Sequence, residues 1–337
     1  ETGTRPGGTW PPDMRVELTP PEWAALLLSD LTDWQRSPLP AADLQPFDLP
    51  DDAYFEYAWQ DAAGARRPDP HNPHPRLNPW WDYASNLTGP DYRPDPDADL
   101  GDARPRGRVL RLDVESNLLG LRRRVIVYSP PGLAEAELPL VLFQDGKAYF
   151  AWGRVPLIYD RLLLRGEVAP AHLVFVPPGE RTSEYFYNAA YRRFLTDEVL
   201  PLVEERARCD GRRTAWGASL GGLLSAMLAW ERRDLFQAVV AQSGAFLFSP
   251  DMKRHDPFSG GEAFLTEVRR GDPRDLRWRL DCGTLEWLIA SNRRLAAALA
   301  AAGADATLVT RSAGHNWVNW RNGVAGALRW ALSRNIG

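Results

Sequence analysis

From residue 107 onward, short apolar runs of strand length alternate with longer segments of helical character. The expected strands are residues 109–114, 124–128, 139–143, 172–176, 214–217, 238–242, 280–282 and 306–310. The expected helices are residues 157–164, 190–205, 220–230, 291–301 and 317–333. Apolar strands separated by helices are typical of a mostly parallel sheet that is buried on both faces. The alternation therefore predicts an α/β fold with helices flanking a mostly parallel sheet.

The first hundred residues follow a different pattern, with many Pro, Asp and Trp residues and little helical periodicity. Strand-like runs at residues 14–18, 24–28 and 54–59 are separated by turn-forming pairs of Pro and Asp. This pattern predicts a small β-sandwich, and residues 90–105 have the composition of a linker. A chain of 337 residues exceeds the usual size of one domain. We therefore expect two domains, residues 1–104 and 105–337.

The strongest motif lies at residues 217–221, which read Gly-Ala-Ser-Leu-Gly and match Gly-x-Ser-x-Gly. A strand-like run precedes the motif and a strong helix-forming segment follows it. In a sharp strand-to-helix turn the serine is exposed, and the flanking glycines remove side chains that would clash. The motif predicts that Ser219 is a nucleophile, and that the backbone amide of Leu220 donates to an oxyanion.

A serine hydroxyl needs a general base, and histidine is suited to that role because its ordinary pKa is near 6.5. Two histidines follow Ser219 in the sequence. His255 lies in a charged stretch that is typical of a surface loop. His315 lies in a Gly-containing loop between the last expected strand and the last expected helix, where this order of catalytic groups places the base. We therefore predict that His315 is the base.

The acidic partner of the base is expected near the end of the next-to-last strand, where two carboxylates compete. Glu286 follows the strand and comes after Gly283, which allows the chain to turn, so we favour Glu286. Asp281 lies within the strand and is the alternative. A second oxyanion donor is expected in the loop after residue 143, from the amide of Gly146 or Lys147. An ordinary strand-ending turn is the other interpretation of that loop.

Composition excludes several classes of function. The formal net charge is -4 and the isoelectric point is about 5.8, without the basic excess of a nucleic-acid binder. No run approaches the roughly 18 apolar residues of a membrane span. Nucleophilic attack by a serine with a histidine base needs no metal or organic cofactor.

The two cysteines are too few for a disulfide framework, so we expect free thiols and a cytoplasmic protein. The chain starts at Glu1 without a signal peptide, which leaves open an earlier removal of a leader.

Five motifs in order resemble the enterochelin (ferric siderophore) esterase family, within the esterase D group of α/β-hydrolases. They are residues 143–146, 181–188, 216–222, 242–246 and 314–321. Residues 29–34, 54–59 and 67–70 resemble the early-set, immunoglobulin-like domain that precedes the hydrolase in this family. The sequence departs from the family pattern at two places. Asn316 stands where the family usually has Asp, and residues 247–248 are Leu-Phe where a Trp pair is common. Neither departure affects the reaction steps.

The resemblance implies a serine esterase of the α/β-hydrolase fold that hydrolyses a small-molecule ester, an enterochelin-like trilactone or its ferric complex. Because such a substrate is anionic, we expect cationic side chains in the pocket. The candidates are Arg154, Arg181, Arg192, Arg321 and Lys147, although Arg181 could instead form a structural pair with Glu184. An esterase for acylated carbohydrates or small phenolic esters is the alternative within the same class. A non-catalytic glycan-binding protein on a hydrolase scaffold is the alternative from another class.

Overall fold

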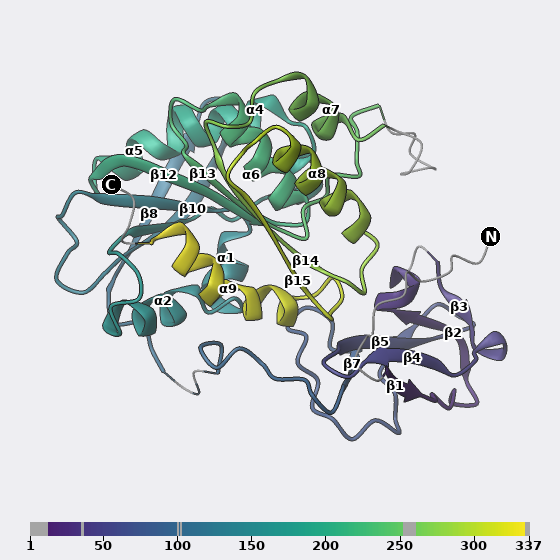
Figure 1. The fold of residues 1–337 in the computed structure, drawn as a ribbon. Coiled ribbons are helices and arrows are strands. Elements are labelled where there is room, and N and C mark those ends of the chain that lie inside the picture. Colours follow the sequence, from purple (N-terminus) through teal and green to yellow (C-terminus); the bar gives the residue numbers. More distant parts are fainter. Residues whose placement is uncertain (1–12, 35–36, 100, 102, 252–260, 334–337) are drawn as a thin grey trace. The chain divides into compact units, whose positions relative to one another are not determined.

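The computed structural model describes residues 13–34, 37–99, 101, 103–251 and 261–333. His255, considered above as a histidine of a surface loop, lies outside these residues. Contacts between residues divide the chain into two compact units (Figure 1). The first unit contains the described residues up to Arg93 together with two short later segments, 283–287 and 311–319, and the second contains the other described residues. The chain thus changes unit after Arg93, eleven residues before the predicted boundary at residue 104.

The first unit is built from antiparallel strands. They are β1 (Asp13–Val16), β2 (Ala24–Ser29), β3 (Leu39–Pro40), β4 (Phe47–Pro50), β5 (Tyr54–Asp61), β6 (Arg66–Arg67) and β7 (Ser85–Thr88). A five-stranded sheet has the order β3-β2-β5-β6, with β7 also paired to β5, and β1 pairs with β4 in a second sheet. The three strands expected from sequence correspond to β1, β2 and β5. The other four strands, β3, β4, β6 and β7, were not expected.

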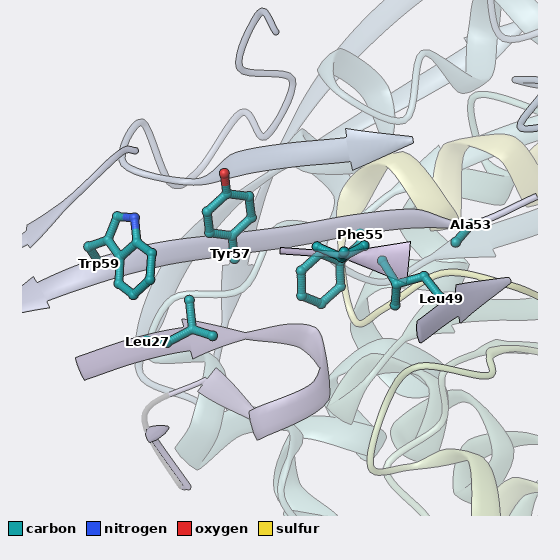
Figure 2. Close-up of a cluster of buried hydrophobic side chains, with 7 residues drawn as sticks. Leu27, Leu49, Ala53, Phe55, Tyr57 and Trp59 are labelled. Atoms are coloured by element: carbon teal, nitrogen blue, oxygen red, sulfur yellow. The ribbon is translucent and has the colours of Figure 1, made fainter. Parts of the chain in front are cut away.

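Strand β5 is the centre of the first unit because both of its faces are buried. Successive side chains of a strand point to opposite faces. Phe55, Tyr57 and Trp59 enter one apolar cluster with Leu27 and Leu49 (Figure 2). The alternate residues of β5 face other buried groups on the second side. A strand buried on both faces fixes its register strongly, which makes β5 a rigid base for the segments that pair with it.

The second unit contains an eight-stranded sheet in the order β15-β14-β13-β12-β10-β11-β9-β8. Its strands are β8 (Arg108–Ser116), β9 (Leu121–Ser129), β10 (Leu138–Phe143), β11 (His172–Phe175), β12 (Cys209–Ala218), β13 (Ala238–Gln242), β14 (Arg277–Gly283) and β15 (Ala306–Arg311). Strands β10 to β14 pair in parallel, whereas β9 runs antiparallel to β11 and to β8. All eight strands predicted from sequence are present, and the predicted mostly parallel sheet is confirmed.

Helices cover both faces of this sheet (Figure 1). They are α1 (Gly146–Ala151), α2 (Val155–Leu164), α3 (Arg181–Tyr185), α4 (Ala189–Arg193), α5 (Leu200–Glu204), α6 (Leu220–Glu231), α7 (Ala263–Arg270), α8 (Ile289–Ala301) and α9 (Trp317–Ala331). Helices α1, α2 and α9 lie on one face, and α4 to α8 lie on the other (Figure 1). No described helix is long and apolar enough to cross a membrane.

The predicted helix over residues 190–205 is present, but its middle is not a regular α-helix. A π-helical segment, η4 (Phe194–Val199), separates α4 from α5. Pro201 lies at the start of α5. A proline has no backbone N–H, and its ring crowds the carbonyl four residues earlier, so a regular α-helix cannot continue through this position. The segment predicted as a helix is thus helical from Ala189 to Glu204, and its middle is π-helical.

Candidate active site

Ser219 occupies a strained turn between strand β12 and helix α6. Its backbone angles are φ 57° and ψ −123°, outside the regions that ordinary residues favour. Strand β12 ends at Ala218 and α6 begins at Leu220, so the predicted strand–turn–helix context is confirmed. A side chain at Gly217 would place its Cβ 2.2 Å from the carbonyl oxygen of Gly221. Glycine is therefore required there for the turn to close.

The first turns of α1 and α6 supply the candidate oxyanion donors. The Gly146 amide donates to the Val176 carbonyl at 2.9 Å, so of the two amides considered in this loop we keep that of Lys147 as the candidate donor. Gly146 is needed for close packing instead, because a Cβ there would lie 2.4 Å from the carbonyl carbon of Phe175. The amides of Lys147 and Leu220 make no hydrogen bond to any described residue. Helix N-termini orient such amides toward developing negative charge.

Arg181 contributes to a charged pair beside the serine turn. Its guanidinium donates to both carboxylate oxygens of Asp145 at 2.7 Å and to the carbonyl of Ala218 at 3.1 Å. A pairing of Arg181 with Glu184 was the structural alternative, but Glu184 pairs with Arg123. Asp145 is 4% exposed, and Arg181 is 30% exposed. Sequence reasoning gave Asp145 no role, although it lies within a recognised motif, because its partner is 36 positions away.

The other arginines predicted to bind an anionic substrate, Arg192, Arg154 and Arg321, lie on different elements of the structure. Arg192 pairs with Glu231 at 2.7 Å, in the last turn of α6. Glu231 lies eleven positions after Leu220, the first residue of that helix, which corresponds to about 17 Å along its axis. We therefore leave Arg192 out of the proposed site. Arg154 donates to the carbonyl of Gly101 at 2.5 Å, and Arg321 is half-buried in the first turns of α9.

His315 and Glu286 are brought together within the first unit. His315 lies between β15 and α9, as predicted. Its Nδ1 is 2.5 Å from Oε2 of Glu286, and Oε1 of Glu286 accepts from the amide of Gly283 at 2.7 Å. A carboxylate can only accept hydrogen bonds, so Nδ1 carries the proton and Nε2 is left as the basic nitrogen. The ring of Trp287 lies 6.2 Å from the imidazole.

Asp281, the alternative acid, lies inside strand β14 and is 1% exposed. Its carboxylate is 3.1 Å from the guanidinium of Arg279, which is also nearly buried. A buried charge is stable only when it is paired, so this carboxylate has a clear structural task in the strand.

Two further carboxylates, Asp30 and Glu56, are buried side by side in the first unit. The backbone amide of Glu56 donates to Asp30 at 2.8 Å. Tyr54 and Asn78 donate to the Glu56 carboxylate at 2.9 and 2.8 Å. Burial raises the pKa of Glu56 to about 7. Burial, and after it the charge of Glu56, raises the pKa of Asp30 well above its ordinary value.

These shifts predict that the first unit loses stability as the pH rises. Because the folded-state pKa of Glu56 is above its ordinary value of 4.5, the folded protein binds this proton more tightly than the unfolded chain. The contribution of the Glu56 proton to the free energy of unfolding is fully present below pH 4.5 and is lost as the pH rises through about 7. Thermal unfolding followed between pH 5.5 and 8 should show a falling midpoint, with a weaker slope in Glu56→Gln. An equal slope in the variant would contradict the assignment to Glu56.

The order of the strands, and of Ser219, Glu286 and His315 along the chain, defines the class of fold. Ser219 follows the fifth strand of the eight-stranded sheet, Glu286 follows the seventh, and His315 follows the eighth. This is an α/β-hydrolase-like fold with a mostly parallel central sheet. The family described as "Putative esterase" matches residues 116–331, well over half of the sequence. The chain belongs to this esterase family.

Solved structures with a similar fold include enterobactin esterases. The enterobactin esterase from Shigella flexneri, in the presence of enterobactin, has a TM-score of 0.74 at 21% identity, covering 91% of this chain and 87% of that one. The ferric enterobactin esterase from Salmonella typhimurium has a TM-score of 0.73 at 22% identity, covering 91% and 88%. A ferulic acid esterase has a TM-score of 0.60 at 23% identity, covering 68% and 99%. The predicted resemblance to enterochelin esterases is thus confirmed at the level of the fold.

One curated relative is the protein YjcH of Bacillus subtilis (strain 168), which is 27% identical over 148 residues. The match covers 41% of this chain and 62% of that protein. The chain therefore spans about three fifths of the length of the relative.

Proposed function

We propose that the protein is a serine esterase in which Ser219 is the nucleophile, His315 the general base and Glu286 the acid. The observation that carries the proposal is the backbone of Ser219, held at φ 57° and ψ −123° at the N-terminus of α6. Strain of this kind persists only where the surrounding structure imposes it, and it concentrates at functional sites. The 2.5 Å contact of Glu286 with Nδ1 of His315 supports the choice of Glu286 over Asp281.

The arrangement of the strands supports a role for these groups in one reaction. Strands β12 and β14 both run parallel to β13 between them. The segments that carry Ser219 and Glu286 therefore leave the sheet at the carboxyl ends of strands, the edge at which open α/β sheets bind their ligands.

The proposed reaction has two halves. Ser219 Oγ attacks the ester carbonyl while Nε2 of His315 takes its proton. The amides of Leu220 and Lys147 stabilise the tetrahedral oxyanion. Collapse of this intermediate breaks the ester C–O bond, the departing alcohol takes the proton from His315, and an acyl-enzyme is left. His315 then activates water, which hydrolyses the acyl-enzyme and restores the serine. The Asp145–Arg181 pair holds the carbonyl of Ala218, and with it the serine turn, in place.

We propose that the substrate is an ester of the enterochelin type, an anionic catecholate trilactone or its ferric complex. Structures named enterobactin esterases share the fold over 91% of this chain. Lys147 is exposed and Arg321 is half-exposed, so both can meet an anionic ligand. We further propose that the antiparallel sheets of the first unit form an early-set, immunoglobulin-like module within residues 1–104, followed by the catalytic domain over residues 105–337.

A panel of substrates tests this proposal. We expect turnover of ferric and iron-free catecholate trilactones at a kcat/KM well above that for feruloyl or acetyl sugars, and labelling of Ser219 by a fluorophosphonate. Preference for the sugar esters would favour the alternative esterase of acylated carbohydrates or phenolic esters. An absence of both labelling and turnover would contradict the proposal and favour a glycan-binding protein on a hydrolase scaffold.

A further inference from the structure

The segments that carry the proposed acid and base are attached to the first unit by backbone pairing. The amide of Tyr54, the first residue of β5, donates to the carbonyl of Ser312 at 2.8 Å. Tyr54 and Ala313 form a parallel bridge. The segment 311–319, which includes His315, is thus hydrogen-bonded to the first residue of β5, the strand at the centre of the first unit.

The two segments are also tied to each other. The amide of Thr284 donates to Arg311 at 2.8 Å, and the amide of Leu285 donates to Ala313 at 3.1 Å. The side chain of Leu285, adjacent to Glu286, packs against the apolar cluster of β5 described above. The segment that carries Glu286 and the segment that carries His315 are therefore both held in place by contacts within the first unit.

Asp30, in the short 3-10 turn η1 (Asp30–Thr32) that follows β2, lies against the histidine segment. A Cβ added to Gly314 would lie 1.9 Å from Cγ of Asp30 and 2.1 and 2.3 Å from its two carboxylate oxygens. Nδ2 of Asn316 lies 3.5 Å from the same carboxylate. The residues on both sides of His315 therefore rest against one side chain.

Asp30 is itself held firmly in place. It is 3% exposed, and it accepts hydrogen bonds from the Glu56 amide at 2.8 Å and from Nε1 of Trp34 at 3.1 Å. Its carboxyl group has two fixed donors and close packing against Gly314, so a shorter side chain would leave a void behind the histidine segment. Voids of this kind allow partial relaxation of the surrounding backbone.

We propose that Asp30 is a positioning residue for His315, because it supports the backbone on both sides of this histidine within the first unit. The inference rests on the proposed function, in which His315 is the base. Misplacement of a catalytic group by about 1 Å can lower a rate about 10²-fold. Asp30 would act through the backbone of Gly314 and Asn316, without touching the substrate.

The test uses four variants of the full chain. Asp30→Ala removes the contact, Asp30→Asn keeps its shape, Gly314→Ala introduces a clash with it, and the fourth combines Asp30→Ala with Gly314→Ala. The matched control is Asp69→Asn, because Asp69 is a buried carboxylate of the same unit that accepts from Tyr57 at 2.7 Å and from the amide of His71 at 2.8 Å. Hydrolysis of p-nitrophenyl acetate gives kcat and KM, and circular dichroism verifies folding.

We expect kcat to fall about 10²-fold in Asp30→Ala and in Gly314→Ala, with KM changed less than about twofold. Asp30→Asn keeps the volume of the side chain against Gly314 but leaves one of its two N–H donors without an acceptor, so its loss of kcat should be smaller than that of Asp30→Ala. Asp69→Asn should retain the wild-type kcat. The double variant should be no slower than Gly314→Ala, because removal of the carboxyl group makes room for the added methyl. Wild-type kcat in folded Asp30→Ala, or losses that simply multiply in the double variant, would overturn the inference. If Asp30→Ala fails to fold, the kcat values of Gly314→Ala and Asp30→Asn test the inference in its place.

A second readout separates this inference from the proposed function. The proton on Nδ1 of His315, held by Glu286 at 2.5 Å, should give a downfield nuclear magnetic resonance signal. We expect the signal in the wild-type protein and its loss or broadening in Asp30→Ala but not in Asp69→Asn. A wild-type protein that shows the signal but no esterase turnover would contradict the proposed function alone. An unchanged signal in Asp30→Ala would contradict the positioning role alone.

Discussion

Replacement of Ser219 by alanine is expected to lower kcat for ester hydrolysis by about 10⁶-fold, because the variant lacks the only atom that forms the acyl-enzyme. The free energy of unfolding should change little, since alanine occupies the same strained turn without a larger side chain. The measurement is hydrolysis of p-nitrophenyl esters together with thermal unfolding.

Ser225→Ala is the matched control for that variant. Ser225 lies in the same helix, and its hydroxyl is buried without a hydrogen-bond partner among the described residues. Removal of such a hydroxyl is expected to be neutral or slightly stabilising and to leave kcat unchanged. Turnover retained in folded Ser219→Ala would remove Ser219 from the mechanism.

The second large effect is expected for Glu286→Gln, with kcat lowered about 10⁴-fold. Glu286 accepts from two donors, the amide of Gly283 and Nδ1 of His315. A glutamine has one carbonyl oxygen and can satisfy only one of them, so its amide group would face the other donor or impose the wrong imidazole tautomer. Steady-state kinetics over a range of pH would measure the loss.

Asp281→Asn is the comparison for that experiment. Its carboxylate pairs with buried Arg279, so the variant should lose about 3 kcal/mol of stability, whereas kcat of the folded fraction should stay near the wild-type value. If Asp281→Asn reduced kcat more than Glu286→Gln, the acid would be Asp281.

Local patterns in the sequence were sufficient to locate the serine turn. The turn depends on glycines within two positions of Ser219 and on a strand and a helix that are adjacent in the chain, so all of its determinants lie in one short segment. The position of His315 between the last strand and the last helix could be predicted for a similar reason, because the order of the elements is itself a property of the sequence.

Contacts between distant segments could not be predicted in this way. The sequence leaves the amides of Gly146 and Lys147 as alternative oxyanion donors, but the amide of Gly146 donates to the carbonyl of Val176, which follows the neighbouring parallel strand. The pairing of Asp145 with Arg181 likewise depends on which loops meet at the end of the sheet. Periodicity and local propensity do not record such partners.

The dependence of the histidine segment on Asp30 is the extreme example. Asp30 and Asn316 are 286 positions apart. The sequence pattern assigned residues 1–104 to a separate domain, and nothing in the composition of that region indicates that it supports a segment near the other end of the chain. The pairing of Tyr54 with Ser312 and the close approach of Asp30 to Gly314 become visible only in the structure.

The membership of residues 283–287 and 311–319 in the first unit has a consequence for folding kinetics. During synthesis, residues 13–93 leave the ribosome early, yet the strand partner of Tyr54 is translated more than two hundred residues later. Pairings over such a separation are slow to form because the loop-closure entropy must be overcome first. The unit that is made first should therefore be completed last, and pulse-labelled hydrogen exchange during refolding would detect this as late protection of the Tyr54 amide, the donor to Ser312.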